Sequence, residues 1–152
     1  SVQNSLTLRD KSMSIEAANS FWLEAGDMSG GSRNQIEFTD DLVKFFDEKS
    51  RSTGEVFLWY DKDVKSVCAL ANRGQDYDQW TNKWRLGLIT KAKGGVEYQG
   101  RVICFEKRKV GQTFAYVTKV TDRDSPLHKE WQKKSAYVGA TFGPEGRPYG
   151  YF

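Results

Sequence analysis

The sequence predicts a mainly β protein with two short helices. Runs of β-branched and aromatic residues, many of them alternating with polar residues, recur along the chain. Turn-forming residues separate these runs, as in the stretches KGG, KVGQ and FGPEGRPYG. Only two segments carry helix-capping residues. Together these observations indicate a barrel or sandwich of about seven to nine strands, and the length of 152 residues is typical of one domain, spanning residues 1–152.

The predicted elements follow one another at short intervals. The strands are residues 5–9, 34–38, 55–60, 64–70, 84–89, 97–106, 113–120, 135–142 and the closing YGYF. The first predicted helix is TDDLVKFFDEK, with Thr39 as N-cap and Asp40 and Asp41 in the first turn. The second is DSPLHKEWQKKS, with Ser125 as N-cap and Pro126 at the first helical position. We expect the two helices to cover the openings of a barrel.

The composition argues against a membrane protein. No apolar run approaches the roughly 18 residues of a membrane span, and no signal peptide is recognisable. Cys68 and Cys104 lie in separate apolar runs without CxxC spacing, so we expect buried free thiols in a reducing cytosol, with one disulfide between neighbouring strands as the alternative. The chain begins without methionine, which fits a processed product or, as we prefer, a domain of a longer protein.

Residues with catalytic potential are few. The single histidine, His128, lies in the second predicted helix, where a solvent-facing position is expected, and it leaves no second base for a nucleophilic triad. The ligand count excludes zinc, and no phosphate-binding glycine loop follows a strand. We therefore expect no catalytic residue, no metal and no cofactor in this chain.

Charge is distributed unevenly. The net charge is only +3, yet residues 1–60 sum to −4 and residues 101–134 to +5. This uneven charge distribution predicts a basic face that is available to bind phosphates. Lys83, Lys91 and Lys93 are the candidates for phosphate contacts.

Two long stretches interrupt the strand pattern, residues 19–33 and 72–83, and both are rich in side chains that can read base edges in a DNA major groove. The candidates in and next to the first stretch are Trp22, Glu24, Ser29, Ser32, Arg33, Asn34 and Gln35. Those in the second are Asn72, Arg73, Gln75, Asp76, Tyr77, Asp78, Gln79, Trp80, Asn82 and Lys83. Their acidic members favour sequence selectivity over simple adhesion to phosphates.

Several candidates have a structural alternative. Asn34 could make a structural hydrogen bond beside Ile36, and Trp22 could anchor the first stretch instead of meeting DNA. Trp84 is expected in the core, whereas Tyr77 and Trp80 could pack on sugars or thymine methyl groups.

The order of landmarks in the chain resembles a known family. "SLTL", "RNQIEF", "FF", "RLGL", "YQGRVICFEK", "FAYVTKV", "SPLHKEW", "AYVGATF" and "RPYGYF" follow one another over nearly the whole chain. This order is similar to the C-terminal DNA-binding domain of the metal-independent, phospholipase-D-type restriction endonucleases, which is itself similar to the plant B3 domain. The resemblance implies a seven-stranded B3-like pseudobarrel that grips the major groove with two arms, here within residues 19–35 and 72–83.

The resemblance also implies a context for the chain. The nuclease site would lie in an N-terminal domain of the same parent chain, in a prokaryotic cytoplasm, and the parent would be a dimer. The expected partner is double-stranded DNA. Two other classes fit a β module with aromatic, amide-rich loops: carbohydrate binding, and stacking of single-stranded nucleic acid on exposed aromatic rings.

Overall fold

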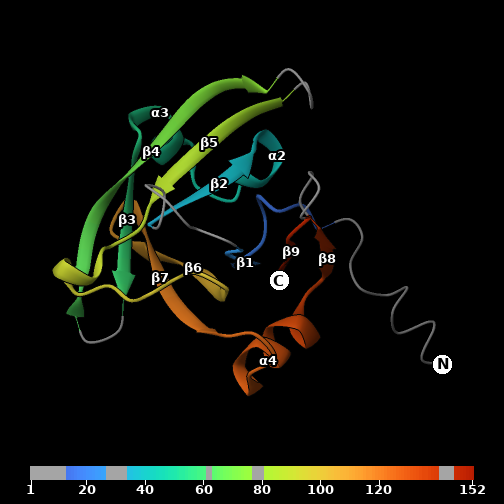
Figure 1. The fold of residues 1–152 in the computed structure, drawn as a ribbon. Helices are drawn as coiled ribbons and strands as arrows, with labels where there is room; N and C mark the ends of the chain where they lie inside the picture. Colours follow the sequence, from blue (N-terminus) through green and yellow to red (C-terminus); the bar gives the residue numbers. More distant parts are fainter. Residues whose placement is uncertain (1–12, 27–33, 61–62, 77–80, 141–145) are drawn as a thin grey trace.

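A computed structural model of the protein describes residues 13–26, 34–60, 63–76, 81–140 and 146–152, and Figure 1 shows the fold. Nine strands in these ranges form one sheet in the order β2-β5-β4-β3-β7-β6-β1-β9-β8. Their bounds are β1 Ser20–Glu24, β2 Gln35–Thr39, β3 Glu55–Tyr60, β4 Lys65–Asp76, β5 Thr81–Gly87, β6 Arg101–Val110, β7 Thr113–Asp122, β8 Tyr137–Ala140 and β9 Pro148–Tyr151. Neighbouring strands are antiparallel, except β3 and β7, which are parallel.

The prediction of a mainly β fold is confirmed, and the sheet curls into a half-barrel (Figure 1). The seven strands implied by the family resemblance are wrong, because the described residues contain nine, the upper end of the range that the sequence pattern indicated. Residues 20–24, which were assigned to an irregular stretch, form the interior strand β1. The hairpin of β8 and β9 extends the sheet beyond β1. The predicted strand at residues 5–9 lies outside the described residues.

The inner face of the curled sheet holds the main hydrophobic core. In β3, for example, Val56, Leu58 and Tyr60 are buried while Glu55 and Phe57 are exposed, as the alternation of a half-buried strand requires. Aromatic rings are prominent among the fully buried side chains of this core, and each of them removes a large apolar area from water.

A smaller core lies on the outer face of β1 and β6, beneath helix α4 (Pro126–Lys134). Trp22 and Trp131 meet there, and the Trp22 indole Nε1 donates a hydrogen bond of 2.8 Å to Ser135 Oγ. Because β1 is covered on both faces, all five of its residues are buried. Gly150 lies opposite Trp22 on β9, and a Cβ there would come within 2.7 Å of the indole nitrogen, so a side chain would force the indole to move.

The first predicted helix is divided into α2 (Asp40–Val43) and α3 (Glu48–Thr53). Thr39 caps α2 as predicted, by accepting a hydrogen bond from the Leu42 amide. Between the two helices Phe45 and Phe46 are fully buried and turn into the core through tight i→i−3 hydrogen bonds. Asp47 then caps α3 by accepting hydrogen bonds from the amide and hydroxyl groups of Ser50.

Helix α4 forms as predicted, with Ser125 as N-cap and Pro126 in its first turn. The expectation that His128 faces solvent is wrong. Its side chain is 1% exposed and packs edge-to-face on Trp22, with 5.2 Å between ring centroids. The Asp124 amide donates to Nδ1, which places the proton of the neutral imidazole on Nε2, and Nε2 has no hydrogen-bond partner among the described residues.

This environment makes stability depend on pH. Burial lowers the pKa of His128, with Glu24 and Asp124 opposing that shift and Arg123 adding to it. Protonation would also replace the Nδ1 acceptor with a donor facing the Asp124 amide. The unfolded chain therefore takes up the proton more readily, and the free energy of unfolding should fall as pH drops below about 6.5.

His128→Asn tests this prediction, because an amide oxygen can accept the same backbone hydrogen bond without titrating near neutrality. Urea denaturation between pH 7.5 and 5 should show that the variant loses less stability than the wild type over this range. If the free energy of unfolding fell equally in the two proteins over this pH range, a group other than His128 would cause the loss.

Cys68 and Cys104 are both free and buried, so the prediction of free thiols is confirmed and the disulfide alternative is wrong. Burial raises the pKa of Cys68 and raises that of Cys104 to about 12. Neither thiol is activated as a nucleophile, because the thiolate is the reactive form.

Candidate functional site

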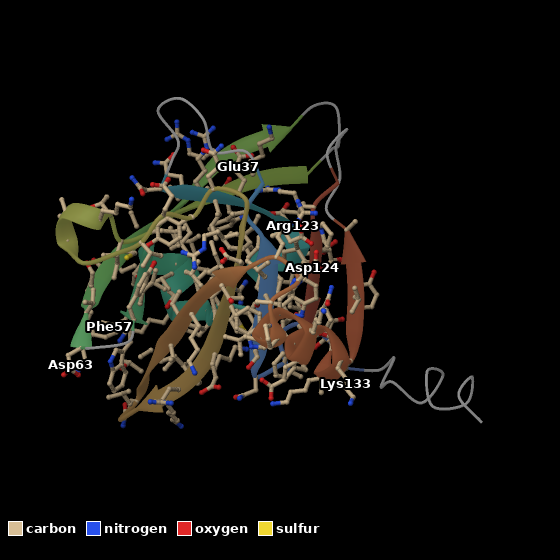
Figure 2. The ribbon with its side chains drawn as sticks, turned by 60° about the horizontal axis from the view of Figure 1, so that its bottom comes forward. Glu37, Phe57, Asp63, Arg123, Asp124 and Lys133 are labelled. Atoms are coloured by element: carbon tan, nitrogen blue, oxygen red, sulfur yellow. The ribbon has the colours of Figure 1, made fainter. Side chains whose placement is uncertain are left out.

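One polar face stands out on the strands β2 and β5. Ile36 and Phe38 of β2 are buried, so the residues between and beside them point away from the core. On β5, Leu86 is likewise buried, and the residues at alternate positions share the outward direction. We call this surface the β2–β5 face; it comprises Gln35, Glu37, Lys83 and Arg85. Figure 2 labels Glu37 on this side of the molecule.

Glu37 and Arg85 form an ion pair on the β2–β5 face. They are direct cross-strand partners, and Arg85 Nε donates to Glu37 Oε1 at 3.1 Å. Their side chains are 37% (Arg85) and 38% (Glu37) exposed. Pairs this exposed to solvent contribute only about 0–1 kcal/mol to stability, so either partner can adopt new contacts at little cost.

The second predicted arm is a β-hairpin and not an irregular stretch. β4 continues to Asp76 and β5 begins at Thr81, so the hairpin projects from the body of the sheet (Figure 1). Its pairing shifts at a bulge between Asn72 and Gln75. There the Asn72 side chain accepts a 2.9 Å hydrogen bond from the amide of Gly74, whose φ of +92° favours glycine.

The structure describes the side chains of some candidate residues on this hairpin and only the backbones of others. Asn72 and Arg73 are exposed near the bulge, and Lys83 is exposed near the base of β5. The backbones of Gln75, Asp76 and Asn82 lie in the paired strands. Tyr77, Asp78, Gln79 and Trp80 lie outside the described residues.

Trp84 fixes the base of the hairpin. It stands opposite both Phe38 on β2 and Asn72 on β4. Its ring packs partly buried against the main core, in agreement with its predicted place, and its Nε1 donates a 2.7 Å hydrogen bond to Asp40 at the start of α2. The hairpin is thus tied to the helix that follows β2.

The first predicted arm needs correction at two residues. Trp22 has no exposed surface and Glu24 is only 7% exposed, because these two residues lie on the interior strand β1. The Glu24 carboxylate also forms an ion pair of 2.8 Å with Arg123. Trp22 is therefore inaccessible to DNA and Glu24 nearly so, and neither belongs to the proposed contacts. The Asn34 carbonyl accepts a hydrogen bond from the Leu88 amide, and Gln35 is exposed at the start of β2. Ser29, Ser32 and Arg33 lie outside the described residues.

The described parts of the two predicted arms lie at opposite ends of the β2–β5 face. Because the strands are antiparallel, Gln35 pairs with Gly87 and Thr39 pairs with Lys83. Asn34 therefore lies at one end, while the hairpin extends from the other. At the usual rise per residue, β2 spans about 14 Å between these ends.

Lys91 and Lys93 lie elsewhere. They belong to the 3₁₀ helix η3 (Lys91–Lys93), which follows the end of β5 remote from the hairpin tip (Figure 1). Both are exposed, and Lys91 forms an ion pair of 3.2 Å with Glu97. They are not part of the β2–β5 face.

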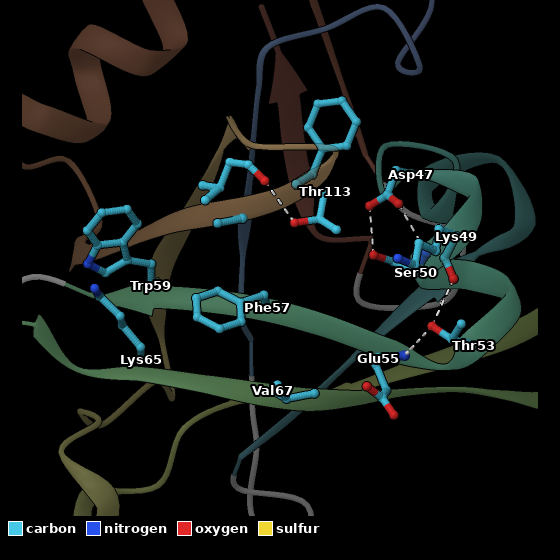
Figure 3. Close-up of a pocket in the computed structure, with 13 residues that line it drawn as sticks. Asp47, Lys49, Ser50, Thr53, Glu55, Phe57, Trp59, Lys65, Val67 and Thr113 are labelled. Carbon is cyan, nitrogen blue, oxygen red and sulfur yellow. Dashed lines mark hydrogen bonds between the residues drawn. The ribbon is translucent and has the colours of Figure 1, made fainter.

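A groove of about 450 Å³ lies on the outward side of β3 and β4, between α3 and the hairpin of β6 and β7 (Figure 3). Phe57, Val67 and Val110 line it and are 37%, 56% and 52% exposed. Lys65 Nζ lies 4.2 Å from the centroid of the Trp59 ring, so part of this ring face is already occupied.

Most hydroxyl groups in the groove are committed within the protein. Ser50 donates to Asp47, Thr53 donates to the Lys49 carbonyl, and Thr113 donates to the Val110 carbonyl. The groove therefore offers mainly apolar contact, with the charged side chains of Lys49, Lys65 and Glu55 in its lining.

Two further observations bear on function. Across the described part of the chain, no three His, Cys, Asp or Glu side chains come together as metal ligands. In the same residues, no helix has the length and apolar character needed to cross a membrane.

A scan against protein-family models and a search of curated proteins both found no match for this chain.

Proposed function

We propose that the protein binds double-stranded DNA in a sequence-specific manner, with the β2–β5 face and its two adjoining segments as the reading surface. The observation that carries the proposal is the grouping of Gln35, Glu37, Lys83 and Arg85 on one exposed face. Arg and Lys bind guanine, Gln binds adenine and Glu accepts from the cytosine amino group. This face combines all three kinds of contact.

The dimensions of the face support the proposal. Asn34 and the β4–β5 hairpin lie at the two ends of a strand of about 14 Å, and the major groove of B-DNA is about 12 Å wide. The proposed contacts of the first segment are Ser29, Ser32, Arg33, Asn34 and Gln35. Those of the second are Asn72, Arg73, Gln75, Asp76, Tyr77, Asp78, Gln79, Trp80, Asn82 and Lys83, with Lys91 and Lys93 as more distant phosphate contacts.

We propose in addition that the protein is the B3-like target-recognition domain of a type II restriction endonuclease. This rests on the order of sequence landmarks described above. In this proposal the phospholipase-D-type nuclease domain belongs to the same parent chain, the parent is a dimer in a prokaryotic cytoplasm, and this domain contributes binding and not catalysis.

Selection from a randomised duplex pool tests the proposal directly. The protein is incubated with the pool in moderate salt and excess non-specific DNA, and bound duplexes are sequenced. A defined motif of a few base pairs is expected. Retention of no DNA, or of all sequences equally, would refute sequence-specific recognition.

Arginine and lysine variants should separate base contacts from phosphate contacts. Arg73→Ala should lose about 1–3 kcal/mol of discrimination at one base pair. Lys93→Ala should weaken binding to all sequences alike and reduce the dependence of the dissociation constant on salt concentration. The measurement is fluorescence anisotropy on the selected duplex and its single-base variants at several salt concentrations. Identical profiles for both variants would contradict this division of roles.

A second candidate function is ligand binding in the groove. The exposed ring of Phe57 offers a surface on which a sugar or an unpaired base could pack. Phe57→Ala should then abolish binding to a glycan array or to single-stranded oligonucleotides while leaving duplex binding unchanged. Loss of duplex binding in this variant would instead place the DNA surface on the groove side of the sheet.

A further inference from the structure

The ion pair on the β2–β5 face has unused hydrogen-bonding capacity. Arg85 bonds to Glu37 through Nε, and its two Nη groups have no partner within the described ranges. Glu37 accepts this bond through Oε1, and Oε2 has no partner in the same part of the chain. Several N–H donors and one carboxylate acceptor thus remain available beside each other on a half-exposed surface.

This arrangement is complementary to one particular base pair. In the major groove a G·C pair presents the guanine acceptors N7 and O6, followed by the N4 amino donor of cytosine. We infer that the Glu37–Arg85 pair reads one G·C base pair, with the Arg85 guanidinium donating to guanine and the Glu37 carboxylate accepting from cytosine. This inference rests on the proposed function.

An A·T pair fits the same residues poorly. Its order in the major groove is acceptor, donor, acceptor, so a carboxylate placed at the last position would face the thymine O4 oxygen. The amino group in the middle would meet the guanidinium, where donor faces donor. The ion pair therefore discriminates through both partners at once, which a single arginine would not do.

The ion pair also places the two reading groups side by side. Both residues extend from paired strands, and the hydrogen bond from Arg85 Nε to Glu37 Oε1 keeps the two side chains next to each other. Since Nε carries this bond, the pair can persist while the Nη groups and Oε2 contact the bases. A rigid strand is a more accurate platform for such contacts than a loop.

The chain provides a matched control. Arg101 and Asp122 are also direct cross-strand partners, on β6 and β7, and Arg101 Nε lies 3.0 Å from Asp122 Oδ1. This pair has the same chemistry but lies outside the β2–β5 face. Asp122→Asn therefore reports the effect of removing one carboxylate charge from a surface ion pair.

The experiment is duplex selection with the wild type, Glu37→Gln and Asp122→Asn, after circular dichroism has shown that all three are folded. The wild-type motif should contain a G·C pair for which Glu37→Gln lowers the preference about tenfold. The other positions of the motif should be unchanged in this variant, and the whole motif should be unchanged in Asp122→Asn. Arg85→Lys, which keeps the charge but not the planar fork, should relax the same position.

The outcomes separate this inference from the proposed function. A wild-type motif that Glu37→Gln leaves unchanged at every position would overturn the inference and leave the proposed function standing. Uniform weakening on all sequences would also overturn it, because the pair would then support the fold or contact phosphates. Absence of any motif for the wild type would refute both.

Discussion

Replacing Phe46 with alanine should lower the free energy of unfolding by about 3–5 kcal/mol, the usual cost of truncating a buried phenylalanine. Phe46 has no exposed surface, and its ring lies at the centre of an aromatic cluster. Four neighbouring rings have centroids 5.0–5.5 Å from the centroid of Phe46: those of Phe38, Phe45, Phe105 and Tyr116. Since small domains are stable by only about 5–15 kcal/mol, this single change should remove a large part of the total.

The measurement is urea denaturation followed by circular dichroism, with Phe57→Ala as the matched control. Phe57 is 37% exposed in the groove, so the same chemical change should cost far less there. Equal losses for the two variants would show that Phe46 is not the centre of the core.

Replacing Asp47 with alanine should cost about 2–4 kcal/mol, from the loss of an N-cap together with an unsatisfied buried hydroxyl. Asp47 caps α3 through Ser50, and its carboxylate accepts a 2.7 Å hydrogen bond from the Tyr116 hydroxyl. In return, the Asp47 amide donates to the Tyr116 oxygen at 2.8 Å. This reciprocal pair attaches α3 to β7.

A double-mutant cycle with Tyr116→Phe isolates the carboxylate–hydroxyl interaction, again by urea denaturation. The two single losses should sum to more than the double loss. Strict additivity would mean that the cap and the hydroxyl act independently.

The charge of Asp47 should make the free energy of unfolding depend on pH. Burial raises the pKa of Asp47, but the hydrogen bonds from Ser50 and Tyr116 outweigh burial, and the pKa is lowered overall. The ionised form therefore stabilises the fold above the pKa of the unfolded chain, and this contribution is lost as pH falls through the folded pKa. Asp47→Asn should retain most of the cap and lose this acid dependence.

Much of the architecture could be predicted from the sequence because many strands are covered on one face. β2 and β3 alternate buried and exposed residues, and such alternation is visible in the sequence. The capping residues Thr39 and Ser125 were equally recognisable. β1 escaped prediction because the main core covers one of its faces and α4 covers the other, so that SFWLE shows no alternation.

The candidate site was predictable only in part. The composition of residues 72–83 predicted a contact surface, which stays a proposal, and did not predict the paired strands, because strand pairing depends on partners distant in sequence. The sequence did not predict Glu37 and Arg85 as candidate site residues, because their pairing also depends on partners distant in sequence. Each could be predicted to face away from the core, but their meeting depends on the register between β2 and β5.

The parallel pairing of β3 with β7 has a kinetic consequence. Leu58 pairs with Tyr116, and β4, β5 and β6 all lie in the chain between them. Contacts between residues so distant in sequence slow folding, because the intervening chain must be ordered before they form. The β4–β5 hairpin, by contrast, pairs locally and can form early. We therefore expect the hairpin to be the first part of the proposed reading surface to fold, and the β3–β7 pairing that joins it to the rest of the sheet to form last.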